Sequence, residues 1–348
     1  MESKKVLLGM SGGVDSSVSA LLLKRQGYDV VGLTMELFGD KEINKKNQED
    51  AKRICDMLDI PHYTLDLKEQ FKKHVIDDFI TCYATCKTPN PCIECNKFMK
   101  FGLMYEKAKE LGCEYIATGH YAKTEYSEKY DKVVIKKSNS IYKDQTYVLW
   151  NISKEIVDHI IFPLGEYENK DQIREIAKEN NLPVYSKPDS EDICFIPDGN
   201  YKGFLERNSD IRPKEGNIVN SSGRVLGRHK GLYNYTIGQR KGLGIQNEVP
   251  LFVLGFNKDK NEVIVGEEKE LYKDSVIAKN VNLLLFEDIE EPIDVDVKTR
   301  YSTKAAKARI EKDGENIKVK FYEPQRAPTP GQSIVFYIDD ILVGGGKM

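Results

Sequence analysis

Short apolar runs alternate with helix-like segments through the first half of the chain. Alternation of this kind predicts a parallel β-sheet covered by helices on both faces. Because ligands of such sheets bind at the carboxyl ends of the strands, we expect the functional site at that edge. The pattern predicts strands near residues 4–10, 29–35, 62–66 and 114–118, and helices near 15–27, 47–58, 68–83, 96–111 and 170–180.

The second half of the chain has a different pattern. After about residue 205, short β-branched or aromatic runs are separated by glycine turns, and from about residue 275 the pattern is strand-like throughout. A chain of 348 residues is long enough for two or three cores of ordinary size. We predict an α/β catalytic domain over residues 1–204, a small central β-rich domain over 205–272 and a C-terminal β-barrel, or a sandwich, over 273–348.

Composition narrows the class of protein. Hydrophobic residues make up 40% and charged residues 31% of the chain, and no apolar stretch is long enough to cross a bilayer. The first residues run directly into a strand and lack the features of a signal peptide, so we expect a cytoplasmic protein without a membrane partner. In that compartment the seven cysteines need not form disulfides. The net charge of −3 argues against a uniformly basic nucleic-acid binder but leaves room for a basic patch.

Residues 9–16, Gly-Met-Ser-Gly-Gly-Val-Asp-Ser, connect the first predicted strand to the first predicted helix. Adjacent glycines allow a sharp turn and a close approach to a ligand, and the free N–H groups of the first helical turn attract anions. The loop is not a Walker motif, because no Gly-Lys-Ser/Thr follows. It resembles the pyrophosphate loop (PP-loop) of adenylating enzymes, which split ATP into AMP and pyrophosphate. The plainer interpretation is a glycine turn that only joins a strand to a helix.

Two cysteines, Cys92 and Cys95, follow a proline-broken loop at the expected start of a helix. The positive end of a helix and the nearby Lys97 and Lys100 predict a lowered thiol pKa here. A third cysteine, Cys194, lies in a loop-and-turn segment. The other four, which fall in helical or strand patterns, are predicted to be structural: Cys55, Cys82, Cys86 and Cys113.

Several segments, taken together and in this order, resemble those of the tRNA-specific 2-thiouridylase family. They span most of the chain: Gly-Met-Ser-Gly-Gly-Val-Asp-Ser at 9–16, Asn-Pro-Cys-Ile-Glu-Cys-Asn-Lys at 90–97, Ala-Thr-Gly-His-Tyr-Ala at 117–122, Lys-Asp-Gln-Thr-Tyr at 143–147, Ser-Glu-Asp-Ile-Cys-Phe-Ile at 190–196 and Thr-Ile-Gly-Gln-Arg-Lys-Gly-Leu-Gly at 236–244. The resemblance implies a PP-loop catalytic domain and ATP-dependent 2-thiolation of the wobble uridine of tRNA. ATP adenylates the C2 oxygen, and sulfur then displaces AMP.

The resemblance also implies roles for individual residues. Asp15 is implied to help hold Mg²⁺, Met35 to lie against the adenine and Gly119 to line the nucleotide site. The triphosphate is implied to bind Gly9, Met10, Ser11, Gly12, Gly13, Val14, Asp15 and Ser16. Contacts to tRNA are implied for Asn90, His120, Lys143, Asp144, Gln145, Tyr301, Ser302 and Gln332.

By the same resemblance, Cys95 is the nucleophile and Cys194 carries the persulfide. Cys194 receives its sulfur from a donor such as a cysteine desulfurase or a sulfur-relay protein. The terminal sulfur passes to the activated uridine, and a disulfide between the two cysteines forms and is later reduced.

One position departs from the family. Many members have an aspartate, proposed as an acid/base, where this chain has Cys92. Glu94 and Asp189 are only loose substitutes for it. Cys92, Cys95 and Cys194 would instead suit a four-iron, four-sulfur cluster whose open iron carries hydrosulfide, whereas a zinc site lacks a clear fourth ligand. A third interpretation makes Cys92 an inert side chain.

Two other functions remain open from the sequence. The PP-loop also occurs in amidotransferase-type synthetases, although this chain shows no N-terminal glutaminase segment and such enzymes do not need the two cysteines. The chain also fits a non-catalytic tRNA-binding or sulfur-relay protein that has kept the nucleotide pocket.

Overall fold

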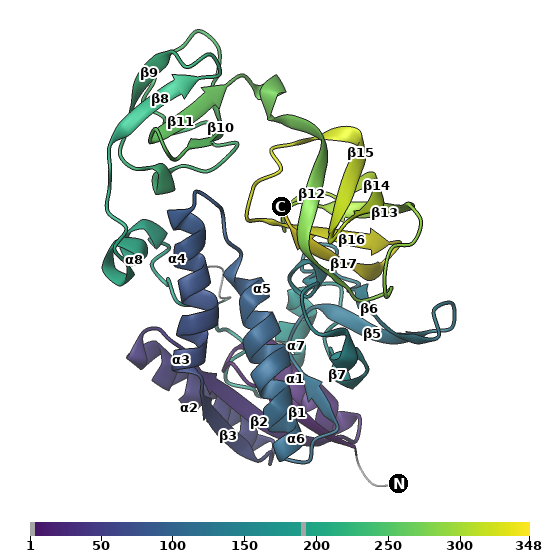
Figure 1. The fold of residues 1–348 in the computed structure, drawn as a ribbon. Helices are drawn as coiled ribbons and strands as arrows, with labels where there is room; N and C mark the ends of the chain where they lie inside the picture. The colour runs from purple at the N-terminus through teal and green to yellow at the C-terminus, as the bar shows by residue number, and fades with distance from the viewer. Residues whose placement is uncertain (1–3, 189–192) are drawn as a thin grey trace.

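The computed structural model describes residues 4–188 and 193–348 of the chain. A parallel sheet with flanking helices forms the base of the molecule, and two β-rich parts lie above it (Figure 1). Asp189 falls outside the described residues, so its role as a substitute for the aspartate stays a prediction.

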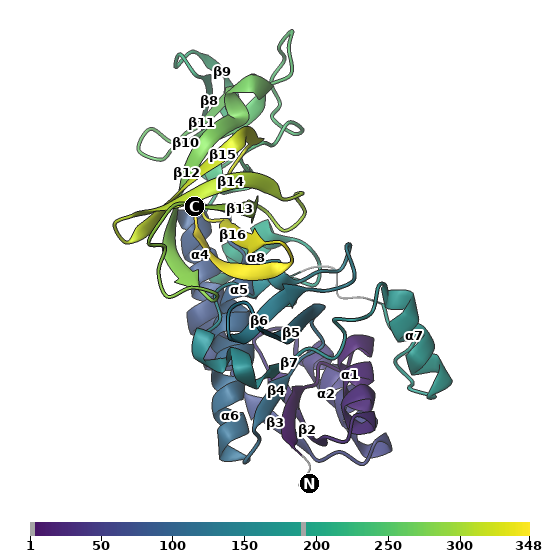
Figure 2. The same cartoon turned by 90° about the vertical axis from the view of Figure 1, so that its right-hand side faces the viewer.

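The sheet has five strands in the order β3-β2-β1-β4-β7, and all of its pairings are parallel. This confirms the predicted α/β class. Helices α1, α2 and α7 pack on one face around Val18, Ile54 and Ile173, and α6 packs on the other face through Met104. Figure 2 shows α7 outside α1. The bounds are β1 Lys5–Gly9, β2 Asp29–Glu36, β3 His62–Asp66, β4 Tyr115–Ala117, β7 Ile160–Ile161, α1 Val14–Arg25, α2 Lys41–Met57 and α7 Lys170–Glu179.

Helix α2 begins at Lys41, well before the predicted start near residue 47. The carboxylate of Asp40 accepts hydrogen bonds from the backbone N–H groups of Glu42 and Ile43, at 2.8 and 3.0 Å. This N-cap satisfies two of the otherwise unpaired donors of the first turn. The sequence prediction relied on apolar spacing, which is weak in this first part of the helix.

Two long helical segments rise from the sheet toward the β-rich parts, and each contains a π-helical stretch (Figure 1). The first consists of α3 Lys68–Phe71, η1 Lys72–Ile76 and α4 Asp77–Ala84. The second consists of α5 Pro91–Cys95, η2 Asn96–Leu103 and α6 Met104–Glu110. Because Pro91 occupies the first turn, this segment starts before the predicted 96 and includes both Cys92 and Cys95.

The central part follows helix α8 Tyr201–Asn208 and forms a small sheet in the order β10-β11-β8-β9. Its core contains Ile218, Val253, Val263 and Val265, each fully buried. The strands are β8 Gly216–Asn220, β9 Val225–His229, β10 Phe252–Asn257 and β11 Glu262–Gly266.

The C-terminal part is a closed barrel rather than a sandwich. Its strands run in the order β12-β15-β14-β13-β16-β17, and β12 also pairs with β17. This confirms the predicted barrel. The bounds are β12 Tyr272–Leu283, β13 Ile293–Lys298, β14 Ala306–Asp313, β15 Asn316–Arg326, β16 Ser333–Ile338 and β17 Ile341–Lys347.

A hairpin that the sequence did not predict connects the barrel to the first half of the chain. Strands β5 Ala122–Ser127 and β6 Lys132–Lys137 pair with each other, and β6 continues the barrel sheet beside β17. The Tyr147 hydroxyl donates a 2.8 Å hydrogen bond to the Ser333 carbonyl across the same contact. The barrel is therefore packed directly on the α/β part. Short 3₁₀ turns lie at Thr146–Val148, Lys154–His159, Leu232–Asn234 and Glu268–Leu271.

Within the described part of the chain, none of the helices combines the length and the apolar character that a membrane crossing needs.

Candidate functional site

The loop between β1 and α1 has the tight geometry that its glycines predict. Gly12 adopts φ +70°, and a Cβ at this position would lie 2.4 Å from the Asn47 carbonyl oxygen. Gly13 is the N-cap of α1 and provides no side-chain cap for its first turn. The N–H groups of that turn therefore remain available for an anionic ligand.

The serine hydroxyls hold this loop in shape. The Ser11 N–H donates to the Ser16 hydroxyl at 3.2 Å, and that hydroxyl donates in turn to the Gly13 carbonyl at 3.2 Å. The Ser17 hydroxyl donates to the same carbonyl at 2.8 Å. The loop is thus closed by its own hydrogen bonds, which reduces the ordering that a bound phosphate would require.

Asp15, in the first turn of α1, already has partners for both carboxylate oxygens. The Tyr121 hydroxyl donates to Oδ1 at 3.0 Å, and the Lys170 ammonium pairs with Oδ2 at 2.9 Å. Lys170 is the first residue of α7. A Mg²⁺ ion at Asp15 would have to share this carboxylate with Lys170, so the magnesium role stays a prediction.

Lys187 is a second lysine at the loop that the sequence analysis missed. Its ammonium donates to the Gly12 carbonyl at 2.9 Å, to Asn47 Oδ1 at 3.0 Å and to Asp50 Oδ2 at 2.8 Å. It therefore connects the glycine loop to α2. No local pattern distinguishes Lys170 or Lys187 from the many other lysines of the chain.

Two further predicted nucleotide-site residues lie at the same edge of the sheet. A Cβ on Gly119 would lie 3.1 Å from backbone atoms of Asp15 and Ser16, so the segment after β4 contacts the start of α1. Met35 lies near the carboxyl end of β2, beside the loop strand β1. It also packs against the core cluster that contains Cys95. The structure thus brings the loop, Met35 and Gly119 together, and their nucleotide roles stay predictions.

The cysteines lie on and around α5, as the sequence predicts. Asn90 is the N-cap, Cys92 is exposed in the first turn, and Cys95 ends the helix with 7% of its surface exposed. Cys194 is exposed, and the next residue, Phe195, is buried in the aromatic cluster that also includes Cys95. The Phe195 ring makes edge or tilted contacts at 5.7, 5.4 and 5.2 Å with Phe71, Phe79 and Phe204.

The predicted lowering of the thiol pKa at this helix is wrong for Cys95. Burial raises the pKa of Cys95 to about 12, and only part of this is offset by the Lys100 ammonium, while the neighbouring Cys194 and Cys92 add to it. At Cys194, whose side chain keeps contact with solvent, partial desolvation by the surrounding protein and the charge of Cys92 also raise the pKa, against the effect of Lys100. Desolvation outweighs both the helix terminus and the lysine, because a thiolate is poorly stabilised away from water. The same terms place Cys92, Cys95 and Cys194 within mutual electrostatic reach.

The described residues show no metal site at the three cysteines. Over residues 4–188 and 193–348, no three cysteine, histidine, aspartate or glutamate side chains converge as metal ligands. A cluster held by Cys92, Cys95 and Cys194 therefore stays a prediction.

Glu94 is not placed to replace the family aspartate as an acid/base. It is buried, and its carboxylate forms a 2.7 Å ion pair with Lys347 at the end of the barrel. Of the two residues considered as substitutes for the family aspartate, Glu94 therefore has a structural partner on another part of the chain.

The residues expected to contact tRNA occupy several environments. His120 is buried, its Nδ1 lies 2.7 Å from the Thr118 hydroxyl, and burial holds its pKa well below the ordinary value. Burial raises the pKa of Asp144, and the Thr146 hydroxyl donates to its Oδ2 at 2.7 Å. The Gln145 side-chain oxygen accepts from the Tyr121 N–H at 2.9 Å.

Other members of this set are accessible or contact the cysteine segment. Lys143, Tyr301 and Ser302 are exposed. The Tyr301 ring is still partly covered by the protein, and this partial burial raises its pKa, with the charges of Asp144 and Cys92 adding to the effect, so the barrel reaches the cysteine helix here. Gln332 donates to the backbone carbonyls at residues 88 and 89. The contacts of these residues with tRNA stay predictions.

Comparisons with known proteins cover almost the whole chain. Family models described as the tRNA methyl transferase HUP domain, the tRNA methyl transferase PRC-barrel domain and the aminomethyltransferase β-barrel domain match residues 4–198, 202–267 and 273–348. The tRNA-specific 2-thiouridylase MnmA of Clostridioides difficile is 49% identical over 99% of this chain and 98% of its own length. The chain belongs to the tRNA-specific 2-thiouridylase family.

A second member of the tRNA-specific 2-thiouridylase family, from Clostridium acetobutylicum, is also 49% identical and covers 99% of both chains. Among solved structures, a 4-thiouridine synthetase–RNA complex with bound ATP is 20% identical over 59% of this chain and 50% of its own, with a TM-score of 0.37. At that score the structural similarity adds nothing to the family assignment.

Replacing Gly12 with alanine should weaken ATP binding. In the variant, the positive φ and a Cβ 2.4 Å from the Asn47 carbonyl oxygen would strain the loop by about 1–3 kcal/mol, which corresponds to a roughly 5- to 150-fold rise in the Kd measured by calorimetry. Gly27→Ala is the matched control, because Gly27 also has a positive φ but open space around it. Equal ATP affinities of the two variants would contradict this geometry.

Alkylation by iodoacetamide should report the raised pKa of Cys95. Because the thiol is buried and protonated, we expect its labelling to be at least about tenfold slower than that of exposed Cys92 at pH 8. The Cys95 rate should rise about tenfold per pH unit from pH 7 to 9.5 without levelling off. Peptide mass spectrometry measures the labelling of each cysteine. A Cys95 labelling rate that levels off below pH 9 would instead support the lowered thiol pKa that the helix start predicts.

Proposed function

We propose that this chain is an ATP-dependent tRNA-uridine 2-sulfurtransferase that thiolates the wobble uridine at C2 and releases AMP and pyrophosphate. Support comes from the relatives named tRNA-specific 2-thiouridylase, which match over nearly the full length. The observation that carries the proposal is that Cys95 and Cys194, which are far apart in the sequence, lie within electrostatic reach of each other, with Cys95 and the neighbouring Phe195 in one aromatic cluster.

The first step activates the base. A uracil carbonyl oxygen is a poor leaving group, so the O2 atom attacks the α-phosphorus of ATP and displaces pyrophosphate. The resulting adenylate makes AMP the leaving group of the next step. The loop of residues 9–16 binds the phosphates through its backbone N–H groups, and Mg²⁺ accompanies the nucleotide.

The second stage transfers sulfur. A donor of the cysteine desulfurase or sulfur-relay type leaves a persulfide on Cys194. The terminal sulfur attacks C2 and expels AMP, which leaves the base joined to Cys194 through a disulfide bond. The Cys95 sulfur then attacks Cys194 Sγ, so that the 2-thiouridine departs and a Cys95–Cys194 disulfide remains. The two cysteines thereby supply the two electrons that reduce the transferred sulfur, and an external thiol restores them.

The environment of the thiols fits this order of events. Because burial keeps Cys95 protonated at neutral pH, it does not react prematurely with oxidants or with the incoming donor. The Lys100 ammonium favours the anionic form of both Cys95 and Cys194 and stabilises negative sulfur as it forms during the transfer.

The printed descriptions of the matching models mention methyl transfer, whereas the relatives are named for thiolation. Methyl transfer needs neither a PP-loop nor a pair of cysteines, so the residues of the site favour thiolation. The full-length similarity to the 2-thiouridylase family likewise weighs against an amidotransferase-type synthetase. The next experiment distinguishes the proposed enzyme from a non-catalytic tRNA-binding or sulfur-relay protein.

Replacing Cys95 with serine should abolish 2-thiouridine formation, with a loss of at least about 100-fold, because serine cannot resolve the disulfide to Cys194. Binding of tRNA should remain within about twofold. Nucleoside mass spectrometry measures the product and filter binding measures the tRNA affinity. Cys113→Ser is the control, since Cys113 precedes β4 at the other end of the sheet from the glycine loop. Retained thiolation by the Cys95 variant would refute the assignment of the nucleophile.

Replacing Asp15 with alanine should cripple ATP-dependent adenylation, because the carboxylate fixes Tyr121 and Lys170 beside the glycine loop. We expect AMP release to fall at least about tenfold. Asp29→Ala, at the exposed start of β2, is the control. AMP release equal to that of the unchanged protein would refute the loop as the nucleotide site.

Iron analysis of protein purified without oxygen distinguishes the two candidate sulfur carriers, a cysteine persulfide and a cluster-bound hydrosulfide. The persulfide route expects far less than one iron per chain together with full thiolation when a sulfur donor is supplied. About four irons per chain with matching acid-labile sulfide would replace the persulfide with cluster-bound hydrosulfide.

A further inference from the structure

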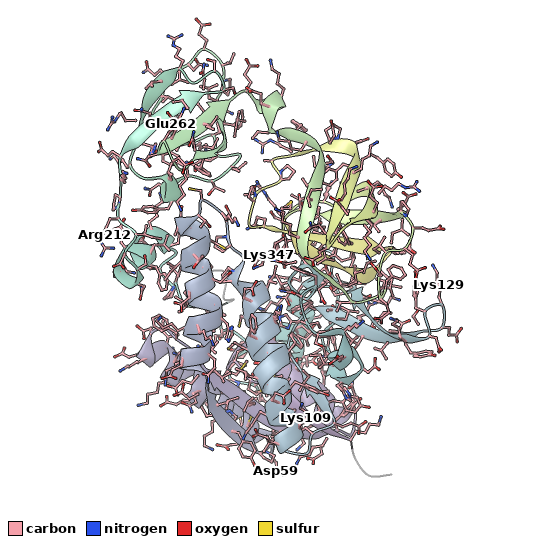
Figure 3. The ribbon with its side chains drawn as sticks, in the orientation of Figure 1. Asp59, Lys109, Lys129, Arg212, Glu262 and Lys347 are labelled. Atoms are coloured by element: carbon pink, nitrogen blue, oxygen red, sulfur yellow. The ribbon has the colours of Figure 1, made fainter. Side chains whose placement is uncertain are left out.

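The penultimate residue of the chain contacts the helix that carries the reactive cysteines. Lys347, at the end of β17, forms a 2.7 Å ion pair with Glu94, which lies between Cys92 and Cys95 on α5. Glu94 is only 7% exposed. Figure 3 shows Lys347 where the barrel meets the upper end of the second helical segment.

The same end of the barrel also holds the segment that leads into α5. The Gln332 side chain donates to the carbonyls of Thr88 and Pro89 at 3.0 and 3.2 Å, and the Thr88 N–H donates to the Pro330 carbonyl at 3.0 Å. A Cβ on Gly331 would lie 2.9 Å from the Thr88 backbone, so these two segments of the chain are in close contact. The barrel therefore contacts both the approach to α5 and its buried face.

Helix α5 depends on such contacts for its orientation. It is the first turn of the second helical segment, Asn90 provides no side-chain cap for it, and it continues into a π-helical stretch, so the turn relies on contacts from other parts of the chain. A buried carboxylate without a partner is strongly unfavourable, so Glu94 stays within reach of Lys347. Burial alone would lower the pKa of Lys347, but the hydrogen bond and charge of Glu94, together with the charges of Asp78 and Cys82, outweigh burial and raise it.

We propose that Lys347, through its ion pair with Glu94, is the positioning residue that seats Cys95 opposite Cys194 for sulfur transfer. The proposal rests on the proposed function, since it concerns the same two cysteines. The Lys347 ammonium pairs with the carboxylate of Glu94, so it acts on Cys95 only through α5. Asp78 on α4 lies 3.7 Å from the same ammonium and forms the other side of this contact.

The first test replaces Lys347 with methionine, which keeps the length of the side chain and removes its charge. The turnover number for thiolation should fall about 100-fold, because a displacement of about 1 Å at a reacting group has an effect of this size. KM for tRNA and Kd for ATP should change by less than about threefold. Lys318→Met is the matched control, because Lys318 forms an exposed 3.0 Å ion pair with Glu311 elsewhere on the barrel.

Rescue separates positioning from a general loss of structure. The double variant Glu94→Gln with Lys347→Met removes the buried carboxylate of α5 together with its partner, whereas Asp78 is partly exposed and can be solvated, so turnover should rise at least about tenfold above that of Lys347→Met. Lys347→Arg, which keeps the charge, should retain most of the activity. A raised KM for tRNA with an unchanged turnover number would overturn the proposal, because the pair would then serve tRNA binding.

A second measurement tests the geometry without ATP or tRNA. Under a mild thiol oxidant such as diamide, the Cys95–Cys194 disulfide should form about tenfold more slowly in Lys347→Met than in the unchanged protein and should recover in the double variant. Equal rates in all variants, read from non-reducing peptide mass spectrometry, would overturn the positioning role. An unchanged protein that forms this disulfide but never thiolates tRNA would instead count against the proposed function alone.

Discussion

The insertion of Phe195 into an aromatic cluster is the interaction on which the candidate site depends. Its ring packs against Phe71 and Phe79 of the first helical segment and Phe204 of α8, which are far apart in the sequence. Each aromatic contact contributes about 0.5–1.5 kcal/mol beyond the burial of area. Because Cys194 precedes this ring, the cluster determines where Cys194, the proposed sulfur carrier, lies relative to Cys95, whose side chain belongs to the same cluster.

This apolar environment has a consequence for the chemistry. Placing Cys95 among aromatic side chains desolvates the thiol and raises its pKa, whereas the start of a helix and a nearby lysine tend to lower it. Desolvation dominates, so the resting Cys95 thiol is protonated. In the proposed reaction, the desolvated surroundings of Cys95 favour transfer of sulfur to the activated base over its loss to solvent.

The barrel is part of the same site rather than an appended module. Strand β6 from the first half of the chain extends the barrel sheet, and the last residues of the barrel hold the segment before α5. Tyr301 of the barrel lies within electrostatic reach of Cys92. The barrel, which is expected to contact tRNA, is thus joined to the cysteine segment by hydrogen bonds and an ion pair. It lies beyond the same edge of the sheet as the glycine loop (Figure 1).

The local features of the fold could be predicted from the sequence. The alternation of apolar runs predicts the parallel sheet, the adjacent glycines predict a turn that Gly12 makes with φ +70°, and Pro91 marks the start of the cysteine helix. These features follow from backbone sterics and side-chain period within a few residues. Only the tertiary structure decided the β5–β6 hairpin in the barrel sheet, the pairing of Lys170 with Asp15 and of Lys347 with Glu94, and the protonated state of Cys95. Each of these depends on desolvation and on contacts between residues distant along the chain, and no local pattern encodes which distant surface will cover a given side chain.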